Sequence, residues 1–475
     1  MDPNPLMLSD FYKTDHRRQY PDGTENVYSN WTPRGSRIPG IDAVVVFGIR
    51  YFIQRWLIDV WNDGFFNQPV DKVIGEYKSL LDECIGGIEL EHIYKLHALG
   101  YLPLEIKALD EGTLCPMRVP MLTITNTDAR FGWLTNYLET LMSAELWGPM
   151  TSATIAHNYR EMLNNWATKT GGTGVQWQGH DFSMRGMRGI EAAAASSAGH
   201  LLSFTGTDTI PAIPWLKKYY DGDGLIGGSV PATEHSVMCL GGDQDELATF
   251  CRLVTEVYPS GIVSVVSDTW NLWTVLTEYM PILKDLIMAR EGKVVIRPDS
   301  GDPADIVCGT GTSSPEGRGV VGLLWDTFGG TVNEAGYKVL DSHVGAIYGD
   351  AITWDRADEI CCRLEAAGFC STNIVFGIGS YTYQYNTRDT FGFAMKATAG
   401  VVNGKMVEIF KDPVTDDGLK KSARGLLCVD AGLVMKDQCS VAEASGGMLK
   451  TVFKNGQLLV KPSLAEIRNR LWPMN

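Results

Sequence analysis

The chain has 475 residues, of which 44% are hydrophobic and 20% are charged, as in an ordinary soluble globular protein. Its formal net charge of −15 argues against a general nucleic-acid binder and against binding to anionic membranes, since both surfaces would repel it. The length allows two domains with a large core. An acidic chain can bind phosphates only through local cations, so each cluster of Arg or Lys is informative.

The ten cysteines form no Cys-x-x-Cys pair, so neither a zinc site nor a disulfide scaffold is expected. No apolar run approaches transmembrane length, and the first residues lack a signal-peptide pattern. We therefore expect a cytoplasmic protein with reduced thiols and with neither nucleic acid nor membrane as a partner.

The first 150 residues mix helices and strands without a clear repeat. Apolar spacing predicts helices at Leu8–Gln19 with Ser9 as cap, Phe52–Trp61, Val70–Cys84, Leu90–Leu99 and Trp133–Trp147. Strands are predicted at Val27–Thr32, Val44–Phe47, Leu104–Ala108 and Val119–Thr125.

From about Thr151 the pattern changes, because helical stretches alternate with short apolar runs that end in small or polar residues. Seven such ends occur, at His180–Phe182, Thr205–Asp208, Glu234–Ser236, Ser267–Asp268, Arg297–Asp302, Gly349–Asp350 and Gly377–Ser380. This alternation indicates βα units with parallel strands. Seven or eight units in about 240 residues favour a (β/α) barrel over an open sheet.

The stretch Val294–Pro303, VVIRPDSGDP, shows the pattern most clearly. Three apolar β-formers are followed by a cation, two carboxylates, a hydroxyl and a glycine, as expected where a buried parallel strand emerges at a ligand-binding rim. The alternative is a solvated turn in which Asp299 caps the next helix.

After the barrel-like stretch, β character returns. Val402–Lys405 and Lys454–Gln457 both place Asn-Gly between apolar runs, which predicts two hairpins. We therefore predict an α/β chain with a (β/α) barrel-like domain at 151–387, inserted between segments 1–150 and 388–475 that build a mixed α+β domain.

The predicted rim combines arginines, carboxylates and one imidazole, His235. Residues Gly377–Ser380 can expose successive backbone N–H groups, which suits a phosphate at a helix start. Carboxylates beside phosphate-binding groups suit Mg²⁺, which prefers oxygen ligands. The residues alone thus indicate a barrel enzyme that acts on a phosphorylated ligand with Mg²⁺, and leave the reaction open.

Together, the motifs resemble the nicotinamide phosphoribosyltransferase family. They are His180-Asp181-Phe182 with Arg185, Gly206-Thr207-Asp208-Thr209, Ser229–Ala232 with Glu234-His235-Ser236, Ser264–Asp268, Ile296–Gly301, Gly349-Asp350 and Thr387-Arg388-Asp389. The resemblance runs from Asp10-Phe11-Tyr12-Lys13 to Phe453–Gly456, nearly the whole chain. It implies a type II phosphoribosyltransferase fold and a homodimer with shared active sites. It also implies that nicotinamide and phosphoribosyl pyrophosphate become nicotinamide mononucleotide and pyrophosphate in NAD biosynthesis and salvage, with Mg²⁺ and with ATP as a co-substrate.

Carried over by position, the resemblance assigns roles along the substrate. Phe182 and the partner subunit's Tyr12 would stack on the pyridine ring, Asp208 would accept from the carboxamide NH₂, and Ser264 and Arg297 would lie near the amide. The ribose hydroxyls would be held by Asp299, Gly349 and Asp350. Phosphates would be bound by Arg185, Gly379, Ser380 and Arg388, with Arg34, Lys396 and Lys411 for pyrophosphate and ATP.

The catalytic set implied by the resemblance is His235, Asp299 and Arg297, with His235 as the residue that ATP phosphorylates. Mg²⁺ would bind through pyrophosphate, with Asp268 or Asp350 as the available carboxylate. Two features depart from the family: the phosphate loop has fewer glycines, and the lysine-rich run after Lys411 is thinner, with Lys420, Lys421 and Arg424 as its cations.

Two other functions compete with this interpretation. One is nicotinate phosphoribosyltransferase, which shares the fold, but Asp208 argues against it because a fixed carboxylate repels nicotinate. The other is a non-catalytic sensing or scaffold protein, which the joint presence of His235, Asp299, Asp350 and Arg388 disfavours.

Overall fold

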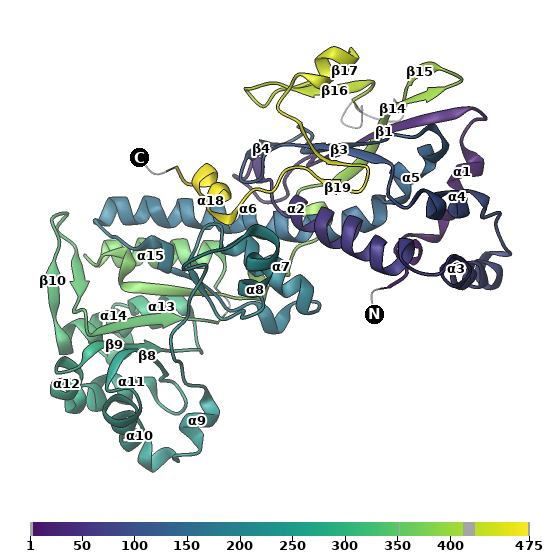
Figure 1. Ribbon diagram of the computed structural model, residues 1–475. Helices are drawn as coiled ribbons and strands as arrows, with labels where there is room; N and C mark the ends of the chain where they lie inside the picture. Colours follow the sequence, from purple (N-terminus) through teal and green to yellow (C-terminus); the bar gives the residue numbers. More distant parts are fainter. Residues whose placement is uncertain (1–2, 351, 412–422, 474–475) are drawn as a thin grey trace. The chain divides into compact units, whose positions relative to one another are not determined.

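The computed structural model describes residues 3–350, 352–411 and 423–473 (Figure 1). The chain divides into two compact units. Unit 1 comprises Met1–Thr154, Trp215–Asp223 and Asn386–Asn475, and unit 2 comprises Ile155–Pro214 and Gly224–Tyr385. The domain limits expected from the sequence, at 150/151 and 387/388, stay a prediction.

Unit 2 is built on a six-stranded parallel sheet with the order β7-β6-β13-β12-β9-β8. Its strands are β6 (Gly179–Asp181), β7 (Gly206–Thr207), β8 (Ser260–Val266), β9 (Glu291–Arg297), β12 (Val344–Tyr348) and β13 (Ile374–Ile378). All five residues of β12 and four of the five in β13 are buried. Continuous apolar runs form such strands because parallel sheets are covered on both faces.

The two edge strands, β7 and β8, are linked through the segment 228–232. Gly206 of β7 forms a parallel bridge with Gly228, and Ala232 forms one with Ser264 of β8. The backbone of Ser264 donates to Pro231 and accepts from Thr233, both at 2.9 Å. The segment 228–232 therefore connects the two edge strands of the sheet and closes it into a ring. The prediction of a (β/α) barrel-like domain is confirmed.

Helices lie between the strands of unit 2 along the chain. They are α7 (Ile190–His200), α9 (His235–Cys239), α10 (Glu246–Arg252), η9 (Leu253–Val257), α11 (Leu272–Thr274), η10 (Val275–Tyr279), α12 (Met280–Met288), α13 (Pro303–Cys308), α14 (Pro315–Phe328), α15 (Trp354–Ala366) and α16 (Ser380–Tyr383). In α15 the side chains of Ala357, Ile360, Cys361 and Leu364 are buried. This spacing of three and four residues gives one apolar face that packs inward.

Unit 1 contains a seven-stranded sheet of order β15-β14-β1-β5-β3-β18-β19. Its strands are β1 (Thr24–Thr32), β3 (Leu104–Ala108), β5 (Leu122–Asn126), β14 (Ala394–Val402), β15 (Lys405–Glu408), β18 (Lys450–Lys454) and β19 (Gln457–Leu458). N-terminal β1 pairs with C-terminal β14, and β3 pairs with β18, all antiparallel. The two ends of the chain thus build one mixed α+β domain, as predicted.

Both predicted hairpins are present. Val402 pairs with Lys405, and Lys454 pairs with Gln457. Each Asn-Gly pair has positive φ at both residues, with 50° and 71° at Asn403 and Gly404. This is the conformation of a two-residue turn that matches the twist of its strands.

Helices of unit 1 cover four of the five predicted stretches, although the one expected at Trp133–Trp147 is divided between α5 (Gly132–Tyr137) and α6 (Glu139–Thr170). The helices of unit 1 include η1 (Pro5–Met7), η2 (Phe11–Asp15), α1 (His16–Gln19), α2 (Ile49–Phe52), η3 (Ile53–Val60), η4 (Asn62–Phe66), α3 (Val70–Ile85), α4 (Glu91–Leu99), α5, α17 (Val441–Ser445), α18 (Leu464–Leu471) and the first part of α6. The single helix expected at Leu8–Gln19 is wrong. The Ser9 hydroxyl donates to the Tyr137 carbonyl at 3.0 Å instead of capping a helix, and the chain forms separate short turns.

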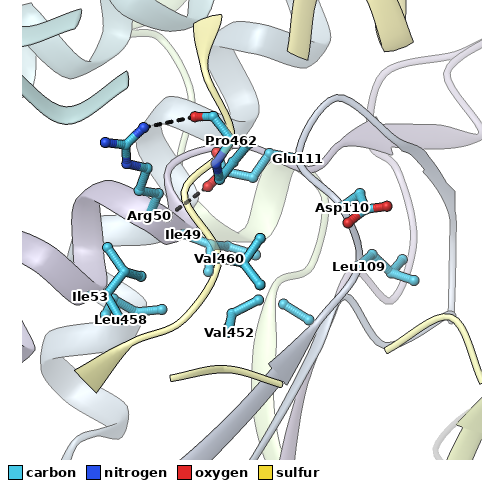
Figure 2. A pocket seen from close by; sticks show the side chains of 11 residues that line it. Ile49, Arg50, Ile53, Leu109, Asp110, Glu111, Val452, Leu458, Val460 and Pro462 are labelled. Atoms are coloured by element: carbon cyan, nitrogen blue, oxygen red, sulfur yellow. Dashed lines mark hydrogen bonds between the residues drawn. The ribbon is translucent and has the colours of Figure 1, made fainter. Parts of the chain in front are cut away.

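A buried carboxylate, Glu111, joins the segment Trp215–Asp223 to the rest of unit 1. It accepts from the backbone N–H groups of Gly48 and Arg50 at 2.9 and 2.6 Å and from the Tyr220 hydroxyl at 2.8 Å. Burial outweighs these donors and raises the pKa of Glu111 to about 7. Arg50, close to Glu111 in Figure 2, donates to the Pro462 carbonyl at 2.9 Å. The cavity between them measures about 20 Å³, room for a water molecule but not for a substrate.

Within the described part of the chain, no helix combines the length and the apolar character that crossing a membrane requires.

Candidate active site

The predicted site residues of unit 2 follow the carboxyl ends of its parallel strands. Phe182 and Arg185 follow β6, Asp208 follows β7, and His235 follows the segment 228–232. Ser264 lies within β8 and Asp268 follows it, while Arg297 is the last residue of β9 and Asp299 follows it. Gly349 and Asp350 follow β12, and Gly379 and Ser380 follow β13. Parallel strands place these ends on the same rim of the ring.

Asp208 is held by one of its two oxygens. Its Oδ1 accepts hydrogen bonds from Ser229 Oγ and lies 2.8 Å from His180 Nε2. Its Oδ2 has no hydrogen-bond partner among the described residues, and the side chain is 46% exposed. Partial burial opposes ionisation, but the bonds from His180 and Ser229 and the charge of Arg297 outweigh it and lower the pKa of Asp208. The site therefore offers an oriented carboxylate with one free acceptor.

The ring of Phe182 rests against two glycines at the ends of neighbouring strands. A Cβ added at Gly377 would lie 2.4 Å from Phe182 Cδ2, and one at Gly349 would lie 3.0 Å from Phe182 Cε2. The His180 ring is also near, at 4.9 Å between centroids. Only glycine lets the backbone approach the ring so closely. The half-buried Phe182 is thus fixed at the rim beside Asp208.

Two buried polar atoms of the neighbouring strands β8 and β9 lack hydrogen-bond partners among the described residues: Ser264 Oγ and Arg297 Nε. Arg297 is held through Nη2, which donates to the Thr233 carbonyl at 2.7 Å. Buried polar groups are nearly always paired, so unpaired ones at a rim mark positions that a ligand can satisfy. These two atoms suit a carboxamide, which both donates and accepts.

The rim after β8, β9 and β12 is rich in carboxylates. Asp268 Oδ2 accepts from the backbone N–H of Asp299 at 2.9 Å and from Ser300 Oγ at 2.6 Å, and its buried Oδ1 has no partner among the described residues. Burial raises the pKa of Tyr348, and the charges of Asp350, Asp268 and Asp299 raise it further. The capping alternative for Asp299 is wrong, because Asp302 caps α13 with bonds to Ala304 and Asp305.

This carboxylate set fits Mg²⁺ only in part. Among residues 3–350, 352–411 and 423–473, no group of three or more His, Cys, Asp or Glu side chains is arranged to hold a metal ion. Mg²⁺ commonly keeps several waters and binds through one or two carboxylates together with substrate phosphates. The unpartnered Oδ1 of Asp268 and the exposed Asp350 suit that mode of binding.

His235 is the first residue of α9 and is exposed. Its Nδ1 lies 3.1 Å from Thr269 Oγ1, and no hydrogen bond is made by its Nε2 to the described part of the chain. The neighbouring Glu234 accepts a hydrogen bond from the Ser236 hydroxyl. The Thr269 hydroxyl can donate or accept, so it orients the ring and leaves Nε2 as the nitrogen available to a reactant.

The predicted phosphate loop, Gly377–Ser380, packs tightly on the loop that carries Arg185. A Cβ added at Gly186 would lie 2.0 Å from Ser380 Oγ, whereas one at Gly379 would meet nothing within 4 Å. Gly379 is therefore open on the side where a Cβ would project. With the exposed guanidinium of Arg185 nearby in the chain, the loop suits an anion.

The remaining predicted residues belong to unit 1. Tyr12 lies in η2 and is 60% exposed, with its ring edge-on to His16 at 5.2 Å. Partial burial lowers the pKa of Lys396; Glu139 opposes this shift, and the positive charges of Arg34, Lys411 and Arg388 reinforce it. These four cations thus form a group whose mutual repulsion an anion would relieve.

In the thinner cationic run, Lys420 and Lys421 lie outside the described residues. Arg424 is described, and its Nε lies 3.8 Å from Glu408 Oε2.

Sequence reasoning did not assign roles to His180, Asp181 and Ser229, although it noted the motifs that contain them. His180 and Ser229 orient Asp208, and Asp181 is completely buried beneath the rim. A polar residue at the end of a short buried strand was the available signal. For Asp181, the partners Thr207 and Thr209 lie in or after another strand, so no local pattern shows them.

Comparisons with known proteins identify the family of the chain. The nicotinate phosphoribosyltransferase (NAPRTase) family model matches residues 177–457, and the nicotinamide phosphoribosyltransferase N-terminal domain model matches residues 4–79. A nicotinamide phosphoribosyltransferase from Acinetobacter baylyi is 55% identical, with 98% of this chain and 97% of the relative covered. One from Mycoplasma pneumoniae is 36% identical, with 86% and 92% covered.

Solved structures show the same fold at low sequence identity. The nicotinate-nucleotide pyrophosphorylase from Pyrococcus furiosus superposes with a TM-score of 0.59 at 15% identity, with 98% of this chain and 95% of that chain covered. Human nicotinic acid phosphoribosyltransferase gives a TM-score of 0.54 at 17% identity, with 98% and 93% covered. The fold is thus that of the type II phosphoribosyltransferases, and with the curated relatives it places this chain, an enzyme, in the nicotinamide phosphoribosyltransferase family.

Proposed function

We propose that the protein joins nicotinamide to phosphoribosyl pyrophosphate, giving nicotinamide mononucleotide and pyrophosphate, and that it couples this step to ATP hydrolysis through phosphorylated His235. The pyridine nitrogen of nicotinamide forms a bond to the anomeric carbon while the bond from that carbon to pyrophosphate breaks. The product carries a positively charged pyridinium ring, and no proton has to be removed from the nucleophile.

The observation that carries the base assignment is the half-engaged carboxylate of Asp208. His180 and Ser229 occupy Oδ1, and Oδ2 remains available to a carboxamide N–H. The carboxylate of nicotinate has no such donor and would be repelled by the ionised Asp208. This contrast favours nicotinamide over nicotinate as the substrate.

The residues around Asp208 complete a site for a flat, weakly polar ring. Phe182 supplies one stacking face, and Tyr12 of a second subunit would supply the other. Ser264 and Arg297 would satisfy their unpartnered atoms on the carboxamide. With the ring fixed in this way, catalysis would come mainly from positioning the pyridine nitrogen against the anomeric carbon.

The displacement resembles glycoside cleavage, because positive charge develops on the ribose as pyrophosphate leaves. Asp299 and Asp350 would hold the ribose hydroxyls, and Arg185, Arg388 and the loop Gly379–Ser380 would hold phosphates. When bound, Mg²⁺ would neutralise charge on the pyrophosphate, with Asp268 or Asp350 as its protein ligand.

For ATP coupling, Nε2 of His235 would attack the terminal phosphorus of ATP. A phosphorus–nitrogen bond forms, the bond to the ADP oxygen breaks, and water later releases inorganic phosphate. The support is the ring contact to Thr269, which leaves Nε2 available. The cationic group of Arg34, Lys396 and Lys411 would take the phosphates of ATP.

The assignment of Tyr12 to a neighbouring site requires a homodimer with shared active sites. The exposure of the Tyr12 ring supports this arrangement, since a ring that stacks on ligand bound to another subunit must project from its own. We propose that the enzyme works in the cytoplasm in NAD salvage.

A base-choice assay tests the proposal. The purified protein is incubated with phosphoribosyl pyrophosphate, Mg²⁺ and either nicotinamide or nicotinate, with and without ATP, and the mononucleotides are separated and quantified. We expect nicotinamide mononucleotide to dominate and ATP to accelerate its formation. Nicotinate mononucleotide as the main product would support the competing enzyme assignment, and no product from either base would support a non-catalytic role.

A further inference from the structure

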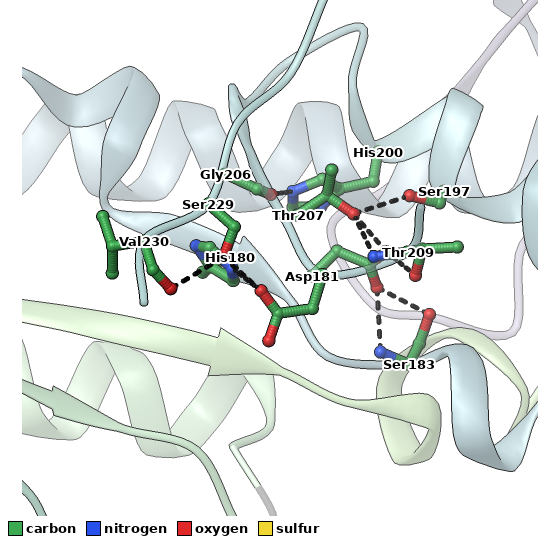
Figure 3. A network of polar contacts seen from close by, with 11 residues as sticks. His180, Asp181, Ser183, Ser197, His200, Gly206, Thr207, Thr209, Ser229 and Val230 are labelled. Atoms are coloured by element: carbon green, nitrogen blue, oxygen red, sulfur yellow. Dashed lines mark hydrogen bonds and ion pairs between the residues drawn. The ribbon is translucent and has the colours of Figure 1, made fainter. Parts of the chain in front are cut away.

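A completely buried carboxylate, Asp181, lies beneath the base-binding end of the site (Figure 3). Its Oδ1 accepts from the backbone N–H and the hydroxyl of Ser183 at 2.9 and 2.6 Å. Its Oδ2 accepts from the hydroxyls of Thr207 and Thr209 at 3.0 and 2.7 Å. One oxygen therefore anchors the loop after β6, and the other anchors the loop after β7.

These anchors flank the two side chains assigned to the base. Phe182 lies between Asp181 and Ser183, and Asp208 lies between Thr207 and Thr209. The Asp208 backbone N–H also donates to the Asp181 carbonyl at 3.0 Å. The separation between the stacking ring and the amide acceptor is thus set by a carboxylate that touches neither.

A second buried side chain, His200 of α7, connects the same strand end to the phosphate loop. Its Nε2 lies 3.0 Å from the Gly206 carbonyl in β7, and its Nδ1 lies 2.6 Å from the Tyr383 hydroxyl in α16, which begins at Ser380. Burial lowers the pKa of His200 to about 4, so the ring is neutral and can donate from Nε2 and accept at Nδ1. Both contacts are then satisfied by a single tautomer.

We propose that Asp181 and His200 are positioning residues for opposite ends of the substrate. Asp181 holds the base-binding residues Phe182 and Asp208 in register, and His200 holds the phosphate loop relative to β7. A buried charge is costly unless several donors satisfy it, and an apolar side chain could fill the same space. The arrangement with one oxygen for each loop gives Asp181 a role that packing alone does not need.

This inference rests on the proposed function. It predicts that binding of the base and binding of the phosphates can be impaired separately by different substitutions. Thr209→Val removes a donor to Asp181 and keeps the side-chain shape, whereas Thr209→Ser keeps the hydroxyl. Tyr383→Phe removes the hydroxyl that meets His200 and keeps the ring. Asp181→Asn is a stronger variant, because an amide nitrogen cannot accept from the two threonine hydroxyls.

The test is steady-state kinetics of the full-length protein, with KM measured separately for nicotinamide and for phosphoribosyl pyrophosphate. We expect Thr209→Val and Asp181→Asn to raise KM for nicotinamide by about tenfold and to reduce the preference over nicotinate, as the loss of a hydrogen bond to a charged group would. The KM for phosphoribosyl pyrophosphate should stay unchanged. Tyr383→Phe should raise the KM for phosphoribosyl pyrophosphate and leave the KM for nicotinamide unchanged. Thr209→Ser should match the wild type in both KM values.

Equal increases of both KM values in Thr209→Val and Tyr383→Phe would overturn the inference, because they would indicate general loosening. An unchanged KM for nicotinamide and an unchanged preference over nicotinate in Thr209→Val would overturn the inference as well. If Asp181→Asn fails to fold, the Thr209→Val and Thr209→Ser pair still decides. Calorimetric binding of nicotinamide and of nicotinate provides the same comparison without turnover. A wild type that binds nicotinamide without converting it would therefore refute the proposed function separately.

Discussion

Nε2 of His180 lies 2.8 Å from Oδ1 of Asp208, and this contact orients the carboxylate that we propose binds the base. With Ser229 on the same oxygen, Oδ2 is the acceptor that remains among the described residues. His180, to which the sequence alone assigned no role, thus determines which oxygen of Asp208 is available.

Asp208→Asn should lower kcat/KM for nicotinamide by about tenfold or more, because an amide cannot replace both acceptor oxygens of the carboxylate. The preference over nicotinate should narrow, since the repelling charge is removed. Parallel assays with both bases measure this ratio. Asp326→Asn, which removes a surface partner of Arg318, is the control and should keep the wild-type ratio. An unchanged ratio in Asp208→Asn would show that another residue selects the base.

Gly377→Ala should displace the ring of Phe182, because the new Cβ would lie 2.4 Å from its Cδ2 and 2.6 Å from Gly349 Cα. We expect the KM for nicotinamide to rise by about tenfold, as for the loss of a well-placed aromatic contact. Gly322→Ala is the matched control, since the nearest side-chain atoms to its Cβ would be those of Arg318, at an ordinary contact distance of 3.7 Å or more. Wild-type kinetics in Gly377→Ala would mean that Phe182 does not need its packing against Gly377 to bind the base.

His235→Ala should abolish ATP hydrolysis and leave slow, ATP-independent synthesis of the mononucleotide, since the displacement at the anomeric carbon does not use the imidazole. Acid-labile phosphate should appear on the wild type with ATP and Mg²⁺ and be absent from the variant. His343→Ala, at the residue before β12 whose ring contacts Asp341, serves as the control. A His235→Ala enzyme that hydrolyses ATP at the wild-type rate would contradict the assignment.

Tyr12→Ala and Asp299→Ala should each be inactive alone and regain activity when the two variants are assembled together. In a shared site, one of the two sites in the mixed dimer would contain both intact residues. Differently tagged subunits allow the mixed dimer to be isolated and assayed. If confirmed mixed dimers show no rescue, Tyr12 does not act on a neighbouring subunit's substrate.

Acid should destabilise the protein partly through His92, which packs edge-on against Trp133 with 4.8 Å between centroids. Burial, aided by the charge of Arg17, lowers the pKa of His92 to about 3 from 6.5. The unfolded chain therefore binds a proton that the folded chain excludes, so stability is present above pH 6.5 and is lost as the pH falls toward 3. This contributes about 1.4 kcal/mol per pH unit.

His92→Phe should accordingly make the unfolding free energy fall less steeply as the pH is lowered. The difference in slope should correspond to the uptake of up to one proton. The Nδ1 atom of His92 has no hydrogen-bond partner among the described residues, so the apolar ring removes the titration without breaking a bond at that atom. Urea midpoints from pH 7 to pH 4, followed by tryptophan fluorescence, measure the slope. Parallel curves for wild type and variant would assign the acid sensitivity to other groups.

Local patterns predicted the elements well wherever the chain itself supplies the stabilising groups. The Asn403-Gly404 and Asn455-Gly456 turns need positive φ, and these residue types accept it, so the hairpins were predictable. The helix at Leu8–Gln19 was not, because Ser9 finds its partner at Tyr137, 128 positions away. A cap and a tertiary hydrogen bond look the same in a sequence.

By itself, the sequence determined the barrel-like unit and the polar rim, because apolar runs that end in charged or small residues form buried strands whose ends must meet water. It did not determine the partners of each oxygen at that rim. The assignment of Asp208 Oδ1 to His180, of Asp181 to both neighbouring loops, and of Asp302 rather than Asp299 to the helix cap appeared only in the tertiary structure. Hydrogen bonds depend on distances of tenths of an ångström between atoms, which residue spacing along the chain does not specify.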